Sequence, residues 1–122
     1  MLCFLSGAVS NVPDYQSRFE QASKDVRFLG FVPVNPDLLS RALLNEGVPD
    51  TREFWLDIDF AALKKCDVVY FLTNWQDSVG ARKEHCIAQA YDIPIIYQEN
   101  LDYYKSIGLT GQELLDKLCS ET

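Results

Sequence analysis

Short apolar runs alternate with longer amphipathic stretches along the chain. Four runs have the length of buried strands, at residues 2–5, 31–34, 67–72 and 93–97. From Val68 onward the third run is apolar throughout, which is typical of a strand covered on both faces in a parallel sheet. The pattern therefore predicts four strands with helical segments between them.

The stretches between the strands carry apolar residues at helical spacing. In the first stretch Pro13 lies near the predicted start, and Gly30 follows the predicted end at Leu29, as is common for helices. The later stretches predict helices at residues 38–43, 52–65, 79–91, 100–106 and 110–119. Either Asp50 or Thr51 is expected to cap the helix at 52–65.

Strands that alternate with helices predict an α/β fold with a parallel sheet and right-handed crossovers. We expect a single domain over residues 1–122, with a flavodoxin- or Rossmann-like sheet of four or five strands in the order 2-1-3-4(-5) and helices on both faces. The strands at 2–5 and 68–72 are the most apolar and should lie side by side at the centre. Ligands of such sheets bind at the carboxyl ends of the strands.

The composition narrows the classes of partner. Eleven Lys and Arg against 18 Asp and Glu give a net charge of −7, which argues against binding of nucleic-acid polymers. No apolar run approaches the roughly 20 residues of a membrane helix, and the first residues lack the basic flank of a signal peptide. We therefore expect a cytoplasmic protein with no membrane partner. The cysteines and the one histidine are not spaced as metal ligands, so we expect no metal and no cofactor.

An acidic residue interrupts the apolar face of the helix predicted at 79–91. Gly80, Ala81, Glu84 and Ala88 recur at spacings of three and four residues and share one helix face. A carboxylate on that face lies against the sheet near the strand ends, where burial is costly without a partner. Glu84 is either a structural carboxylate in a hydrogen-bond network or a functional group. Gly80 leaves room for a ligand to approach it.

Asp59 interrupts the helix that precedes the third strand in a similar way. It shares a stripe with Trp55 and Ala62, which places it on the inward face, whereas Asp57 points roughly the other way. The alternative is an ordinary solvated helix acid. If Asp59 and Glu84 converge on one pocket, they predict acid–base or nucleophilic chemistry of the kind used by retaining glycosidases.

Loop residues are further candidates for ligand contacts. Ser6 and Gly7 follow the first strand, where backbone amides can hold a phosphate, although a plain strand-to-helix turn also fits. Trp75 can stack on a base or pack on the surface. Ser78 directly precedes a predicted helix, where its hydroxyl and the helix dipole favour an anion, and an ordinary helix cap is the alternative.

Several of these residues form a set of motifs. Phe4 to Gly7 reads FLSG, residues 35–36 read NP, and residues 75–84 read W-x-x-S-x-G-A-x-x-E. Together with Asp59, this set resembles the nucleoside 2-deoxyribosyltransferase-like superfamily over residues 2–97. Within it the chain is similar to small phage and prophage members and to nucleoside 5′-monophosphate N-glycosidases.

The resemblance implies a role for each matching residue. Glu84 corresponds to the nucleophile that attacks the anomeric carbon, and Asp59 assists at the departing base. Ser78 stands where the transferases have an aspartate for sugar hydroxyls and the N-glycosidases have a serine for the 5′-phosphate. Gly7 belongs to the loop that lines this site, although residues 8–11 lack the basic residue expected near a phosphate.

The resemblance favours cleavage or exchange of the N-glycosidic bond of a nucleoside or nucleoside 5′-monophosphate. Two other functions fit the same residues. One is a phage-type protein that binds a nucleotide or nucleotide signal without turnover, and the other is a structural oligomer. A sheet of 122 residues with short loops covers a pocket poorly on its own, and the resemblance also implies a site completed by a neighbouring chain. We therefore expect a homodimer or larger assembly, with Tyr103 and Tyr104 as candidates for the shared wall.

Overall fold

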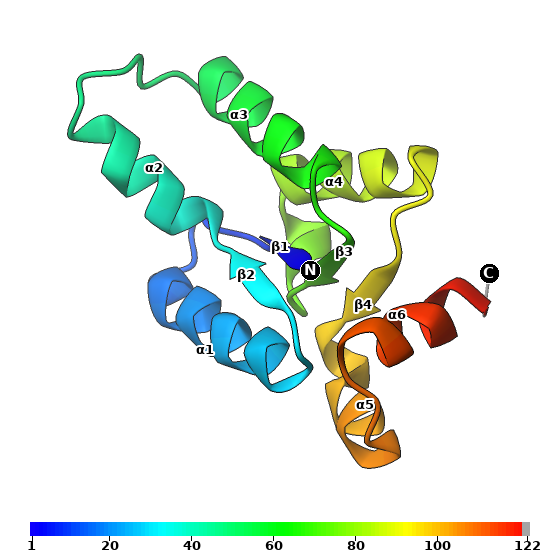
Figure 1. Cartoon of the computed structure of the whole chain (residues 1–122). Helices are drawn as coiled ribbons and strands as arrows, with labels where there is room; N and C mark the ends of the chain where they lie inside the picture. Colours follow the sequence, from blue (N-terminus) through cyan, green and yellow to red (C-terminus); the bar gives the residue numbers. More distant parts are fainter. Residues whose placement is uncertain (121–122) are drawn as a thin grey trace.

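The computed structural model describes residues 1–120 of the chain (Figure 1). Its strands are β1 (Leu2–Ser6), β2 (Val32–Val34), β3 (Val68–Phe71) and β4 (Ile95–Tyr97). Its α-helices are α1 (Tyr15–Phe28), α2 (Pro36–Leu44), α3 (Arg52–Lys64), α4 (Val79–Ala90), α5 (Leu101–Ile107) and α6 (Gly111–Ser120), and short 3₁₀-helices cover Trp75–Asp77 and Gln98–Asn100. No helix in this described part is long and apolar enough to span a membrane.

The strands form one parallel sheet in the order β2-β1-β3-β4, which confirms the predicted class and order. Phe4 of β1 lies opposite Val34 of β2 and Val69 of β3, and Val69 lies opposite Ile95 of β4. Every residue of β3 is buried, as expected for a central strand covered on both faces. Within residues 1–120 the sheet has four strands, so the optional fifth strand is not formed there.

Helices cover both faces of this sheet (Figure 1). On one face α1, α5 and α6 pack in a core cluster that includes Leu5 and Phe19. On the other face α3 and α4 pack in a second cluster that includes Phe4, Leu63 and Ala88. Successive strand residues point to opposite faces, so Phe4 and Leu5 enter different clusters. The layered α/β arrangement expected from the sequence is confirmed.

Side-chain caps set where two helices begin. Thr51 accepts a hydrogen bond from the Phe54 N–H at 3.2 Å, so Thr51 rather than Asp50 caps α3. Ser78 accepts one from the Ala81 N–H at 3.1 Å and caps α4. These bonds satisfy amides that have no acceptor within the first helical turn.

Helices α2 and α3 form an arm that extends from the sheet and turns back at residues 45–51 (Figure 1). No residue of α2 is buried, and Leu63 is the one buried residue of α3. Within the arm, α2 therefore contributes no buried residue to either core cluster, whereas the end of α3 anchors the arm through Leu63. The arm overhangs the carboxyl end of β1, where ligands of parallel sheets bind.

Candidate functional site

A cavity of about 300 Å³ lies between the α2–α3 arm and the carboxyl end of β1. This volume is at the lower end of the range for small-molecule sites. Six of the seven residues predicted to form the site line the cavity: Ser6, Gly7, Asp59, Ser78, Gly80 and Glu84. The fold thus brings together residues from β1, α3 and α4 that are far apart in the sequence.

Glu84 lies on the buried face of α4 between Ala81 and Ala88, and only 7% of it is exposed. The Ser6 hydroxyl donates a hydrogen bond to its Oε1 at 3.1 Å. Its Oε2 is buried and accepts no hydrogen bond from any residue in 1–120. Burial and the nearby Asp59 carboxylate raise the pKa of Glu84 to about 8, although the Ser6 bond opposes this shift. One carboxylate oxygen is therefore held in place by a hydrogen bond, and the other is buried without a hydrogen-bond partner among residues 1–120.

Asp59 is half-buried on α3 and lines the same cavity. Burial raises the pKa of its carboxyl to about 6. Asp57, two residues earlier, is exposed. Of these two acids, Asp59 is therefore the one that faces inward. Among residues 1–120 no three His, Cys, Asp or Glu side chains come together in a way that could hold a metal ion.

The two glycines of the cavity differ in how much room their neighbours leave for a side chain. A Cβ atom at Gly7 would lie 2.9 Å from the Cβ of Leu72, closer than packed side chains approach. Gly7 is therefore required by the close approach of its loop to the chain after β3. At Gly80 the nearest atoms would be Leu56 Cδ2 at 3.6 Å and Ser78 Oγ at 3.8 Å. A methyl group fits there, so Gly80 leaves open space beside Ser78.

A second hollow of about 640 Å³ adjoins the cavity and shares Asp59, Ser78 and Gly80 with it. Arg52, the first residue of α3, lines this hollow. It supplies a cation near Ser78 that the loop after β1 lacks. The sequence analysis did not single out Arg52, yet a signal was present, because Arg52 lies three residues before Trp55 and seven before Asp59 on the same helical stripe.

The structure does not bring Trp75 to the cavity. Its ring stacks on His85 at a centroid distance of 4.3 Å and an interplanar angle of 12°, and it also contacts Phe71. His85 Nε2 lies 2.6 Å from the Tyr97 hydroxyl, and burial lowers the pKa of His85. These rings lie with the cluster of α3 and α4. Of the two alternatives for Trp75, this arrangement favours packing over contact with a ligand in the cavity.

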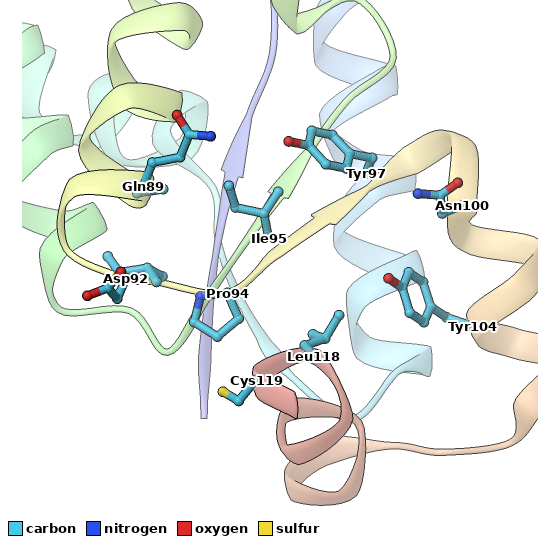
Figure 2. Close-up of a pocket in the computed structure, with 11 residues that line it drawn as sticks. Gln89, Asp92, Pro94, Ile95, Tyr97, Asn100, Tyr104, Leu118 and Cys119 are labelled. Carbon is cyan, nitrogen blue, oxygen red and sulfur yellow. The ribbon is translucent and has the colours of Figure 1, made fainter. Parts of the chain in front are cut away.

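A further groove of about 610 Å³ runs along the open edge of β4 (Figure 2). Ile95 and Tyr97 of β4 face it, with Leu118 and Cys119 of α6 on the other side (Figure 2). None of the seven predicted site residues lines this groove. Tyr104 does, so it lies away from the cavity of its own chain.

Comparison with known proteins identifies one family. The model of a domain of unknown function, DUF4406, matches residues 1–97. The matched segment runs from β1 to the end of β4 and contains every residue that lines the cavity. No curated protein and no solved structure matches the chain. Because the match covers most of the 122 residues, the chain belongs to the DUF4406 family.

Proposed function

We propose that this protein cleaves or exchanges the N-glycosidic bond of a nucleoside or nucleoside 5′-monophosphate, as a relative of the nucleoside 2-deoxyribosyltransferases. One observation carries the proposal: Glu84, whose buried Oε2 has no hydrogen-bond partner among residues 1–120, lines the same cavity as Asp59 at the carboxyl end of β1. Retaining glycosidases use two carboxyl groups that flank the scissile bond, one as the nucleophile and one as the general acid.

In this mechanism Glu84 is the nucleophile. The Ser6 hydroxyl donates a hydrogen bond to Oε1 and holds the side chain in place, and the Glu84 carboxylate attacks C1′ of the sugar to form a covalent glycosyl-enzyme. Asp59 donates a proton to the departing base. Water or a second base then gives a proton to Asp59 and attacks C1′, and Glu84 leaves as a carboxylate. The outcome is hydrolysis with water and exchange with a second base.

This mechanism requires a particular distribution of protons between the two carboxyls. Their pKa values are raised to about 6 for Asp59 and about 8 for Glu84, so between these values the pair holds one proton. Catalysis with a neutral base requires one ionised and one protonated carboxyl. Because the pKa of Glu84 is the higher of the two, the proton lies mainly on Glu84 in the free protein, and it must move to Asp59 when the substrate binds, before Glu84 attacks.

The surroundings of Ser78 favour a 5′-monophosphate over a free nucleoside. The Ser78 hydroxyl can donate to a phosphate oxygen, and the first amides of α4 have no acceptor within the helix. Arg52 in the adjoining hollow supplies positive charge. Asp77 lines the same hollow and opposes an anion there.

Loss of base release in Glu84→Gln tests the proposal. Free base is followed by chromatography after incubation with a panel of nucleosides and 5′-monophosphates. We expect Glu84→Gln to slow release by several orders of magnitude, since the amide keeps the volume but is not a nucleophile. Glu113→Gln, a change of an exposed acid on α6, is the control and should leave the rate unchanged.

The alternatives predict different results. Full turnover by Glu84→Gln would remove the nucleophile from the mechanism. A wild type that binds nucleotides but releases no base, with weaker binding in Glu84→Gln, would identify a nucleotide-binding protein instead. Absence of both turnover and binding would favour a structural oligomer.

A further inference from the structure

The cavity is acidic and contains no balancing cation among the described residues that line it. Four lining residues carry carboxyl groups and none is Lys, Arg or His: the acids are Asp37, Asp50, Asp59 and Glu84. Asp37 pairs with Arg41 of its own helix at 2.8 Å, and Asp50 accepts a hydrogen bond from the Trp55 indole at 2.8 Å. Within residues 1–120 neither Asp59 nor Glu84 forms an ion pair.

This charge pattern disfavours some ligands and favours others. A partly buried cavity strengthens electrostatic interactions relative to water, so two unpaired carboxyls repel an anionic group placed beside them. A cation beside them is stabilised, and Glu84, which lines the cavity, has one buried oxygen, Oε2, that has no hydrogen-bond partner among residues 1–120. Tyr15, Phe19 and Trp55 also line the cavity, and aromatic rings attract cations over their faces.

We propose that the nucleoside held in this cavity carries a fixed positive charge on its base, as in a pyridinium nucleoside or an N-alkylated purine nucleoside. The inference rests on the proposed function and names its substrate class. The acidic cavity holds the charged base and the sugar carbon that reacts, whereas Arg52 and Ser78 in the adjoining hollow face the 5′ end of the sugar.

A cationic base simplifies the reaction. Its charge favours the ionised form of Glu84, which releases its proton to solvent as the ligand binds. A lone pair of the Glu84 carboxylate forms the bond to C1′ while the C1′–N bond breaks, and the electron pair of the broken bond neutralises the ring nitrogen. The base leaves as a neutral molecule, so Asp59 need not donate a proton and serves as the counter-charge. Water then adds its oxygen to C1′, Glu84 leaves as a carboxylate, and the remaining proton goes to solvent.

The groups around the cavity set the pH dependence of binding. They are Tyr15 from α1, Asp37 from α2, Asp50 from the loop before α3, Asp59 from α3 and Glu84 from α4, with Arg52 of α3 in the adjoining hollow. Because the pKa values of Asp59 and Glu84 are raised to about 6 and about 8, the cavity gains negative charge as the pH rises from 5 to 9. Affinity for a cation should rise over the same interval.

A matched pair of ligands tests the inference. Nicotinamide riboside carries a pyridinium charge, and its reduced form has the same substituents without that charge. Calorimetry at pH 8.5 should show about tenfold tighter binding of the charged form. Asp59→Asn should reduce this preference, whereas Asp57→Asn, the same charge change at an exposed position two residues away, should preserve it.

Proton release provides a second measurement. The titration of nicotinamide riboside at pH 7 is repeated in two buffers of different ionisation enthalpy. Wild type should release protons on binding, and Glu84→Gln should release markedly fewer. A purely structural Glu84 would give the same release in both proteins.

The outcomes separate the inference from the proposed function. Equal binding of the two forms, or binding of neither, overturns the inference whatever the turnover. Tighter binding of the charged form without release of nicotinamide supports the inference and overturns the glycosidase mechanism. Release of bases from neutral nucleosides at rates that exceed those for charged ones supports the mechanism and overturns the inference.

Discussion

Glu84 is the residue whose environment differs most from that of an ordinary surface acid. Its side chain is buried, one oxygen is bonded to Ser6, and the other has no partner among residues 1–120. Burying a carboxyl in this way favours its neutral form. Ionisation of Glu84 in the folded protein therefore lowers the free energy of unfolding, whereas the neutral form does not.

That cost predicts a pH-dependent effect of Glu84→Gln on stability. The folded-state pKa is raised from 4.5 to about 8, so the contribution of Glu84 is fully present below pH 4.5 and is lost as the pH rises through 8. Measured by urea unfolding, the free-energy difference between the two proteins should be constant below pH 4.5 and shift by about 5 kcal/mol in favour of Gln by pH 9. Parallel stability curves across this range would contradict the raised pKa.

Ser78 and Arg52 predict how the phosphate end of the substrate is recognised. Ser78→Asp keeps a good helix cap but places a negative charge beside a 5′-phosphate. If wild type prefers a 5′-monophosphate to its nucleoside, both Ser78→Asp and Arg52→Gln should lose that preference. Lys83→Gln, at an exposed position on α4, is the control. Equal handling of both substrates by wild type would leave Ser78 as an ordinary cap.

At this scale the sequence identifies residues that break a pattern. Glu84 and Asp59 were found because each is an acid on an apolar helical stripe, and the structure places both in one cavity. Arg52 was missed because a cation at a helix start breaks no pattern, and its proximity to Ser78 depends on tertiary packing. Trp75 lies elsewhere because a 3₁₀ turn at Trp75–Asp77 directs the ring toward His85.

At the scale of the elements, periodicity predicted every strand and every α-helix of residues 1–120, but neither of the two short 3₁₀-helices. The residues that cap α3 and α4 could be narrowed to one or two candidates each. The sequence did not reveal how loosely the arm is packed. The apolar residues of α2 recur at helical spacing, which predicts burial, yet none of them is buried. Periodicity shows which residues share a face of a helix but not whether another element covers that face.

The two cavity glycines predict opposite responses to alanine. In Gly7→Ala the new Cβ meets Leu72 at 2.9 Å, so the loop or the strand must shift, at a cost of about 1–3 kcal/mol. In Gly80→Ala the methyl group fits, and loss of a helix glycine is neutral or stabilising by up to about 1 kcal/mol. Thermal unfolding of both variants measures the difference. An unchanged melting temperature for Gly7→Ala would show that the close approach is not required.

At the scale of the whole molecule, the strand order explains why the site forms where it does. β1 and β3 are adjacent at the centre of the sheet, so their carboxyl ends deliver Ser6 and the loop that leads to Ser78 to one edge. Helix α3 of the arm places Asp59 at the same cavity. Parallel topology could be predicted from the alternation of elements, whereas the overhang of the arm could not, because it follows from contacts that are far apart in the sequence.

The cavity rim predicts an assembly of more than one chain. Val9 and Leu44 line the cavity and Val79 lines the adjoining hollow, and these side chains are 44%, 41% and 43% exposed. Exposed apolar residues gathered at one place commonly mark an interaction surface. We therefore expect light scattering at micromolar concentration to give at least twice the mass of one chain, with the rims of two copies in contact.

Leu44→Glu tests whether a second chain covers the cavity or associates through another surface. A charge at this position should dissociate the assembly and weaken nucleoside binding, since the partner would no longer cover the cavity. Phe28→Glu alters a side chain that is 62% exposed on α1, outside the cavity lining, and should leave both mass and affinity unchanged. A wild-type monomer that binds nucleosides normally would show that one chain completes the site. An assembly that survives Leu44→Glu would place the contact on another surface, and the open edge of β4 in Figure 2 is then the next to test by substitution.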